Sequence, residues 1–335
     1  MKDNIIKAFE TLVDHAKAVR ESVFKVRMYQ KAIQAFKSHN GDIRTFSDAQ
    51  KVLRRVFKTP GKIEEKTKEL FETGKISAVV AAEKNDVAKA IKVLTSVPQI
   101  GPSKAMFLVK NHGITSIALL KKATHLLHDK QIMGLKYYDE LIDPNTLDAK
   151  RIPRSEIDAF AAALKRFVPR GMKYEILGSY RRGAPESGDI DVLFTGKGEG
   201  AEGFKTLIRD LTSAQILGDH FSAGSTKWMG MGKPPGFDTH RRIDLMRVSE
   251  DEYPFAVLYF TGSKEFNERF RGIARAKGYT LNEHRIEHIH GARRKVDHKF
   301  TSERDIFEFL GVPYVTPRNR TRGKFSLRNV SVKSL

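Results

Sequence analysis

The most constraining stretch of the chain is GSYRRGAPESGDIDVLF, residues 178–194, in which two aspartates stand one residue apart at the start of an apolar run. Alternate side chains of a β-strand share a face, so Asp189 and Asp191 point to the same side. Ile190 and Val192 then point into the core. Two carboxylates on one face of a buried strand are tolerated only where cations neutralise them or where their pKa values rise. The stretch therefore predicts a strand of a covered sheet with a positive charge against it.

A second run of the same kind, RRIDLMRV at residues 241–248, carries a third aspartate. Asp244 alternates there with Ile243 and Leu245, so it also points away from the core. If this strand lies beside the first, three carboxylates converge. Hard oxygen ligands on a rigid sheet suit Mg²⁺, and two such ions about 3.5–4 Å apart form a clamp for in-line phosphoryl or nucleotidyl transfer. The alternative is a strand end with solvated acids, beside arginines in surface ion pairs.

The residues ahead of the paired aspartates are of the kinds that hold a phosphate. Gly178 lets a ligand approach the backbone, and Ser179 offers a hydroxyl. Arg181 and Arg182 offer charge-assisted donors, and Gly188 allows a turn whose N–H groups face an anion. A D-x-D pair alone is a weak sign. Glycine, serine, arginine, D-x-D and a later aspartate, in this order, point to a nucleotide with its metal ions.

The charge of the chain favours a polyanionic partner. Lysine and arginine total 60 of the 335 residues, aspartate and glutamate total 40, and the net charge is +20. Such an excess attracts nucleic acid first and an anionic membrane second. No stretch approaches the roughly 20 apolar residues that span a bilayer, and the N-terminus lacks the apolar region of a signal peptide, so we expect no membrane partner. The absence of cysteine excludes disulfides, thiol nucleophiles and cysteine-ligated zinc.

Periodicity divides the chain into helical and sheet-containing parts. Apolar residues recur at helical spacing up to about residue 150, and breakers that contain glycine or proline separate the segments. The loop IDPNTLDAKRIP at 142–153 marks a boundary. Beyond it, alternating β-branched runs and intervening helices predict an α+β architecture with a mixed sheet, followed by a basic tail. The predicted domains are residues 1–90, 91–150, 151–250 and 251–315, with the tail at 316–335.

Three stretches together resemble signatures of X-family DNA polymerases, most closely the polymerase beta branch: residues 178–194, residues 241–248, and YFTGSKEFNERFRGIARAKGYTLNEH at 259–284. The resemblance covers nearly the whole chain. It implies an all-helical lyase-like N-terminal domain and helical fingers, then a nucleotidyltransferase palm with a mixed sheet and a small α/β thumb. It also implies an enzyme of base excision repair that fills short gaps in DNA by templated addition of deoxynucleotides.

The resemblance assigns the three aspartates to two Mg²⁺ ions, for which Mn²⁺ is a substitute. Asp189 and Asp191 would bind both ions, and Asp244 would bind only the catalytic one. Asp244 would also help to deprotonate the primer 3′-hydroxyl, which metal coordination makes more acidic.

Contacts to the phosphates of the incoming nucleotide follow from the same resemblance. Ser179, Arg182 and the backbone of Gly188 match positions that hold the β- and γ-phosphates. Arg151 matches an arginine that reaches the γ-phosphate, although a surface charge at the start of a helix is the alternative interpretation.

The YFTG stretch at the start of the third signature matches a turn that reads the sugar. Tyr259 and Phe260 would lie beside the deoxyribose, and the turn at Gly262 would exclude a 2′-hydroxyl. Template-independent relatives tend to replace the tyrosine–phenylalanine pair, so the pair favours templated synthesis. Asn267 and Arg271 would contact the minor groove of the new base pair, where such contacts test shape and not sequence.

Three positions depart from the beta branch. Lys264 stands where an aspartate lies near the nucleotide base, and Glu268 stands where a lysine lies beside the templating base. Met246 stands where an arginine takes part in the switch from the open to the closed state. These changes bear on fidelity, nucleotide affinity and closure, and they leave the metal ligands untouched.

A second activity is implied by GKIEEKTKELFETGK, in which Lys62 and Lys66 share a helix face. Lys66 matches the lysine that forms a Schiff base with a 5′-deoxyribose phosphate, after which β-elimination releases the sugar phosphate without metal. The amine must be neutral to attack, and neighbouring cations favour that state. Lys25 and Tyr29 match the same pocket, whereas Phe24 stands where the beta branch has a stacking histidine. The alternative is a solvated basic face that binds DNA phosphates.

The stretch TSVPQIGPSKA, residues 95–105, fits a helix-hairpin-helix element. The carbonyls of Thr95, Val97 and Ile100 would hold a monovalent cation, Na⁺ or K⁺, and Gln99 stands where glycine is usual. The stretch VFKTPGK, where a first such element should lie, lacks a Gly-x-Gly pattern, and we expect no cation there. The DNA contacts that the resemblance implies are Lys25, Tyr29, Lys62, Gly101, Arg242 and Arg271.

Two other interpretations of the sequence stay open. One is a nucleotidyltransferase that acts on RNA ends or small molecules, and the other is a DNA-binding scaffold without catalysis. The basic N-terminal half and the tyrosine–phenylalanine pair argue against the first, and three crowded carboxylates argue against the second. We expect a monomer that acts on gapped or nicked DNA and dNTP, with repair protein partners unknown. The basic tail favours the nucleus, with a mitochondrial or viral origin left open.

Overall fold

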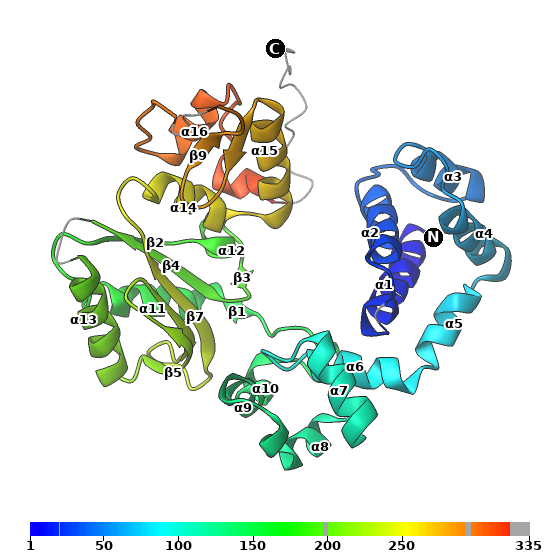
Figure 1. Cartoon of the computed structure of the whole chain (residues 1–335), viewed down its shortest axis with the longest axis horizontal. Helices are drawn as coiled ribbons and strands as arrows, with labels where there is room; N and C mark the ends of the chain where they lie inside the picture. The colour runs from blue at the N-terminus through cyan, green and yellow to red at the C-terminus, as the bar shows by residue number, and fades with distance from the viewer. Residues whose placement is uncertain (20, 197–199, 292–295, 322–335) are drawn as a thin grey trace. The chain divides into compact units, whose positions relative to one another are not determined.

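The computed structural model describes the chain except residues 20, 197–199, 292–295 and 322–335 (Figure 1). The chain forms two compact units, residues 1–138 and 139–335. The division falls just ahead of the predicted boundary loop. The finer domain limits stay predictions, and most of the predicted basic tail lies outside the described residues.

Every regular element in the described part of the first unit is a helix. Helices α1 to α4 enclose a core that includes Phe9, Tyr29 and Phe36. Side-chain caps start several helices; Thr45 and Asp48, for example, form a reciprocal capping box. Its elements are α1 Lys2–Ala18, α2 Val23–Lys37, α3 Phe46–Arg54, α4 Lys62–Thr73, α5 Ser77–Glu83, α6 Asp86–Thr95, α7 Pro102–His112, α8 Ile117–Lys122, η1 Thr124–Leu126 and α9 Asp129–Lys136, with α10 Tyr138–Leu141 at the junction.

The second unit is built on a five-stranded mixed sheet in the order β2-β4-β7-β6-β5. Strands β4 and β7 are parallel, and the other neighbouring pairs are antiparallel. Its elements are β1 Ile152–Pro153, α11 Arg154–Leu164, β2 Lys173–Ile176, α12 Gly178–Arg181, β3 Glu186–Ser187, β4 Ile190–Thr195, α13 Gly200–Ser213, β5 Leu217–Ala223, β6 Lys227–Gly232, β7 Arg241–Arg247, α14 Tyr253–Thr261, α15 Lys264–Ala276, β8 Tyr279–Leu281, β9 Ile286–His288, α16 Glu303–Phe309 and η2 Pro317–Arg320.

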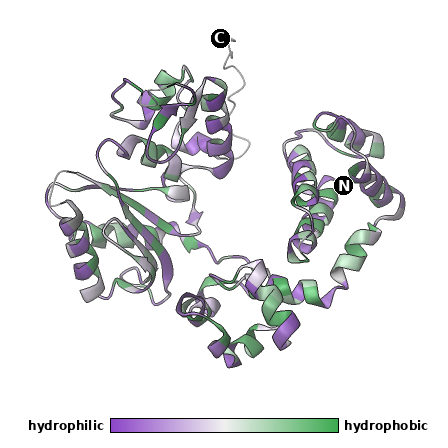
Figure 2. Ribbon diagram, in the orientation of Figure 1, coloured by the Kyte–Doolittle hydropathy of each residue, from purple (hydrophilic) through white to green (hydrophobic). Residues whose placement is uncertain are grey.

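The two faces of the sheet have different covers. Val192 and Leu245 pack with Phe160 of α11 and Phe204 of α13 in one fully buried cluster. Leu193 points to the opposite face, where it joins residues of α14. The alternation that the sequence predicts along β4 is therefore present, and the aspartates share the face of Leu193. Helices in Figure 2 carry hydrophobic and hydrophilic stretches side by side, as elements that bury one face should.

The remaining elements form a small α/β layer beyond the sheet. Its core is aromatic. The rings of Phe266 and Phe270 stack with centroids 5.4 Å apart, and the ring centroids of Phe270 and Phe307 are 4.6 Å apart. Helices α14, α15 and α16 and the β8–β9 hairpin supply this core. The predicted α+β class and mixed sheet are thus confirmed. None of the helices within the described ranges is both long enough and apolar enough to cross a membrane.

Candidate active site

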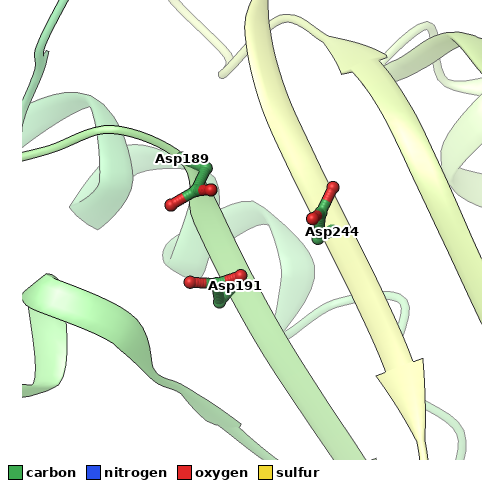
Figure 3. Close-up of side chains that lie close together, drawn as sticks. All are labelled: Asp189, Asp191 and Asp244. Carbon is green, nitrogen blue, oxygen red and sulfur yellow. The ribbon is translucent and has the colours of Figure 1, made fainter. Parts of the chain in front are cut away.

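The three aspartates meet on, or directly ahead of, two adjacent parallel strands (Figure 3). Asp191 on β4 lies in register with Asp244 on β7, and Asp189 directly precedes β4. Each carboxylate offers an oxygen within 4.8 Å of the others. The predicted convergence of three carboxylates is therefore confirmed as geometry.

The electrostatics of this cluster favour a bound cation. Burial raises the pKa of Asp191 to about 8, and the charges of Asp189 and Asp244 act in the same direction. Burial likewise raises the pKa of Asp189, which Arg242 opposes. Three carboxylates crowded in this way can all be ionised at neutral pH only if further positive charge enters. An all-oxygen donor set of this kind fits Mg²⁺ or a similar divalent cation.

One cation of the protein already touches the cluster. Arg242 donates from Nη2 to Oδ2 of Asp244 at 3.0 Å and from Nε to Oδ1 at 3.4 Å. Its side chain is 44% exposed, whereas that of Asp244 is 9% exposed. Arg242, which the resemblance implies as a DNA contact, therefore lies where it can touch both a metal ligand and solvent.

The turn after β2 closes tightly on Asp191. A methyl group built on Gly178 would lie 2.6 Å from Oδ2 of Asp191, and Gly178 has a φ of +60°. The N–H of Leu177 donates to the carbonyl of Asp191 at 2.8 Å. Both the space and the left-handed backbone at residue 178 require glycine.

The predicted phosphate contacts gather beside this turn. Ser179 donates to the hydroxyl of Ser187 at 2.8 Å. Strand β1 pairs with β3, which brings Arg151 beside Gly188: a methyl group on Gly188 would lie 3.2 Å from its Nη1. Arg151 also donates to the carbonyl of Glu186 at 3.1 Å. The structure thus places these residues together, and their contact with phosphate stays a prediction.

The two arginines of the motif differ in their surroundings. Arg182 donates to the carbonyl of Thr261 at 2.6 Å. Burial lowers the pKa of Arg182; Asp191 opposes that effect, while Arg151 and Arg320 add to it. Its guanidinium therefore lies among other cations, a surrounding that a bound anion would relieve.

Arg181, expected beside Arg182 as a phosphate donor, is engaged elsewhere. Its Nε donates to Glu175 at 2.6 Å, and its Nη1 donates to Glu303 at 2.9 Å and to Thr261 at 2.8 Å. Its side chain is 18% exposed. The expectation for Arg181 is corrected: it bridges the sheet to helices α14 and α16.

Sequence reasoning missed two further arginines that support the site. Arg154 donates to the carbonyls of Tyr180 and Ala184 at 2.9 and 3.4 Å and lies 3.8 Å from the centre of the Tyr180 ring. Arg241 makes a buried two-point ion pair with Glu156 at 2.7 and 2.8 Å. Both contacts join residues far apart in the chain, so no local pattern signals them.

The residues of the predicted sugar-reading turn lie together where α14 meets α15. The Tyr259 and Phe260 rings meet edge to face at 5.0 Å. Asn267 donates to the carbonyl of Tyr259 at 2.7 Å, and the Arg271 guanidinium lies 4.8 Å from the Tyr259 ring centre. Gly262, with a φ of +60°, ends α14. Their roles toward nucleotide and DNA stay predictions.

The three departures have different settings. Met246 packs at the edge of an apolar cluster that also includes Tyr253 and Phe260. Lys264 and Glu268 are exposed on α15. An apolar contact between β7 and α14 therefore stands where the resemblance to the beta branch implies an arginine.

The predicted lyase residues lie on two helices that share one core. Lys62 and Lys66 lie on α4, and Lys25 and Tyr29 lie on α2. Tyr29 is 4% exposed, and burial raises its pKa. Lys25 forms an ion pair with Glu21 whose hydrogen bond raises the pKa of Lys25. Phe24 is 71% exposed.

The predicted helix-hairpin-helix contains a tight turn between α6 and α7. The N–H of Ile100 donates to the carbonyl of Val97 at 3.0 Å, and Gln99 has a φ of +70°. With Pro98 at the second position, this is a type II turn, which favours glycine where Gln99 stands. Gly101 is the N-cap of α7. The cation at the Thr95, Val97 and Ile100 carbonyls stays a prediction.

Comparison with known proteins gives two family matches and several relatives. Residues 151–250 match the DNA polymerase beta palm, and residues 256–321 match the DNA polymerase beta thumb. The chain is 30% identical to DNA polymerase lambda of Arabidopsis thaliana, over 75% of this chain and 50% of the relative. It is 28% identical to DNA polymerase lambda of Rattus norvegicus, over 87% and 52%.

A bacterial protein is also similar. The chain is 23% identical to the DNA polymerase/3′-5′ exonuclease PolX of Bacillus subtilis (strain 168), over 96% of this chain and 55% of the relative. The chain spans about half the length of these curated relatives. The beta branch thus appears in the names of the matching palm and thumb, whereas these relatives carry the names lambda and PolX.

Proposed function

Since residues 151–250 and 256–321 form the palm and thumb of an X-family DNA polymerase, we propose that this chain fills short gaps in DNA by templated addition of deoxynucleotides. The observation that carries the proposal is the cluster of Asp189, Asp191 and Asp244 on parallel strands. Divalent cations bound there would supply Lewis-acid stabilisation of the charge that develops during nucleotidyl transfer.

The protein's own groups bind and orient the substrates around that cluster. Ser179, Arg182, Gly188 and Arg151 gather beside Asp191, where their donors suit a triphosphate. Asp244 is the carboxylate that we expect beside the primer 3′-hydroxyl. The exposed part of the Arg242 side chain suits a contact with the primer phosphate nearest the 3′-hydroxyl.

Selection of the correct nucleotide belongs to the junction of α14 and α15. The edge-to-face pair of Tyr259 and Phe260 gives the deoxyribose a rigid wall. Asn267 and Arg271 contact Tyr259, and this shared position supports a role for both in testing the minor groove of the new base pair. A mismatched base pair displaces the edge of the minor groove, so the hydrogen bonds from Asn267 and Arg271 to that edge would be lost.

Template dependence tests this proposal. A primer on a one-nucleotide gap is offered each dNTP separately with Mg²⁺, and the same primer is offered them as a single strand. We expect extension only with the complementary dNTP on the gapped substrate. Extension of the single strand at a similar rate would support the rival nucleotidyltransferase instead. No extension of either substrate by a folded protein would support the scaffold.

A lyase activity is a second proposal, favoured by the setting of Lys66. This lysine is half-buried on α4, which packs on α2 with its buried Tyr29. Borohydride trapping on a 5′-deoxyribose-phosphate end should be lost in Lys66→Ala. Lys68→Ala is the matched control, because Lys68 lies on the same helix, is exposed, and pairs with Glu72. Equal trapping in both variants would place the Schiff base elsewhere.

A further inference from the structure

The C-terminal 3₁₀ turn η2 lies against the turn at residues 178–183, where we propose that the nucleotide phosphates bind. A methyl group built on Gly183 would lie 3.3 Å from Nε of Arg318 and 3.4 Å from its Cγ. Gly183 directly follows Arg182 and has a φ of +77°. The side chain of Arg318 is thus seated on the backbone of the same turn that carries Ser179 and Arg182.

Arg320, the buried last residue of η2, fixes η2 in place. Arg320 is 0% exposed and donates to Glu303 at 2.8 Å and to the carbonyl of Val315 at 2.9 Å. Ser263 donates to the carbonyl of Arg320 at 2.8 Å. The backbone two residues after Arg318 is therefore rigid, and Arg318 is held where it lies by more than its own side chain.

Arg318 itself is free to bind an anion. Its side chain is exposed, and among the described residues its guanidinium has no hydrogen-bond or ion-pair partner. It lies beside a turn that already holds Arg182, whose own surroundings include Arg151 and Arg320. The positive charges of Arg182, Arg151 and Arg320 repel one another unless an anion lies among them, and Arg318 reaches the same turn at Gly183.

We propose that Arg318 is a further phosphate-binding residue, which contacts the terminal phosphates of the incoming nucleotide. The inference rests on the proposed polymerase function. A guanidinium suits this task because its planar donors match phosphate oxygens in pairs. The other source of the same chemistry is a phosphate of the DNA, which the experiment separates.

Steady-state gap filling by Arg318→Ala tests the assignment. We expect the KM for dNTP to rise by roughly three- to tenfold, with kcat and the Kd for gapped DNA unchanged, because one charge-assisted contact to the nucleotide is lost. Inhibition by inorganic pyrophosphate should weaken by a similar factor. Arg318→Lys should retain part of the affinity, since it keeps the charge and loses the fork.

Arg209→Ala is the matched control, because it removes an exposed arginine of α13 whose ion-pair partner, within the described part of the chain, is its neighbour Asp210. A KM for Arg318→Ala equal to that of this control would overturn the inference. So would a raised Kd for gapped DNA with an unchanged KM, most clearly if it occurs with a 5′-phosphate in the gap and not with a 5′-hydroxyl. A parent chain that extends no primer would instead overturn the proposed function.

Discussion

At the scale of single residues, the site depends on glycines and carboxylates in close contact. Gly178 leaves room for Asp191, and burial raises the pKa of Asp191 to about 8. The sequence shows a glycine ahead of the aspartates, but it does not show that the two residues touch. That contact arises because β2 ends at Ile176 and the chain turns back over β4.

Gly178→Ala should show two separate effects, a loss of stability from backbone strain and a loss of activity from the displaced Asp191 carboxylate. The left-handed φ costs the variant about 1 kcal/mol of stability, and the new methyl group displaces the Asp191 carboxylate, so gap filling should fall by roughly a hundredfold or more. Gly236→Ala is the control: its φ is +85° and nothing lies within 4 Å of the new methyl group. It should lose similar stability and keep its activity. Thermal unfolding and primer extension measure the two effects.

Gln99 offers a gain in stability. Its φ of +70° is strained for a residue with a side chain, so Gln99→Gly should raise the free energy of unfolding by about 0.5–1 kcal/mol. Gln99→Ala keeps the strain and should gain nothing. Chemical denaturation compares the three proteins, and a less stable glycine variant would show that the Gln99 side chain contributes more than its backbone costs.

At the scale of elements, the sequence predicts strands from alternating side chains, and it misses contacts between residues that are far apart in the chain. Alternation along residues 189–194 and 241–248 is sufficient to place three aspartates on one face, because strand period is a local property. The stretch MKYEILGSY has strand character throughout, yet the strand ends at Ile176, since Gly178 takes a left-handed φ and starts α12. Arg181 and Glu303 pair across 122 residues of sequence, which no local pattern records.

The ion pairs of Glu303 join α12, α16 and η2, and they make a pH prediction. Burial would raise the pKa of Glu303, but the hydrogen bond and charge of Arg320, together with Arg181, outweigh it and hold the pKa below its usual range. A carboxyl with a lowered folded-state pKa stabilises the fold above its unfolded pKa of about 4.3 and loses that effect as the pH falls further.

Glu303→Gln should therefore cost about 3 kcal/mol at pH 7, because it leaves Arg320 buried without its counter-charge. The difference from the parent should narrow as the pH falls below about 4. Glu308→Gln, an exposed change on the same helix, is the control and should be neutral. Urea denaturation at several pH values measures this, and a difference that stays constant down to pH 3 would contradict the ionic role.

At the scale of the whole molecule, charge and composition restrict the partner and local motifs restrict the chemistry. The net charge of +20 favours a polyanion without saying which. Binding of gapped DNA should weaken by about tenfold or more between 50 and 200 mM salt, because phosphate contacts release counterions. Fluorescence anisotropy gives the slope, and an affinity independent of salt would contradict a DNA interface of this kind.

The central claim is that Asp189, Asp191 and Asp244 form a cation-dependent centre for nucleotidyl transfer. The most direct measurement is extension of a primer on a one-nucleotide gap by the parent and by Asp244→Asn, each with Mg²⁺ and with EDTA. Asp210→Asn serves as the control, because Asp210 is a half-buried residue of α13 that pairs with Arg209 and lies outside the cluster. We expect extension by the parent and the control with Mg²⁺ and none with EDTA, and a loss of roughly a hundredfold or more in Asp244→Asn. Extension by Asp244→Asn at the parent's rate, or by the parent in EDTA, would contradict it.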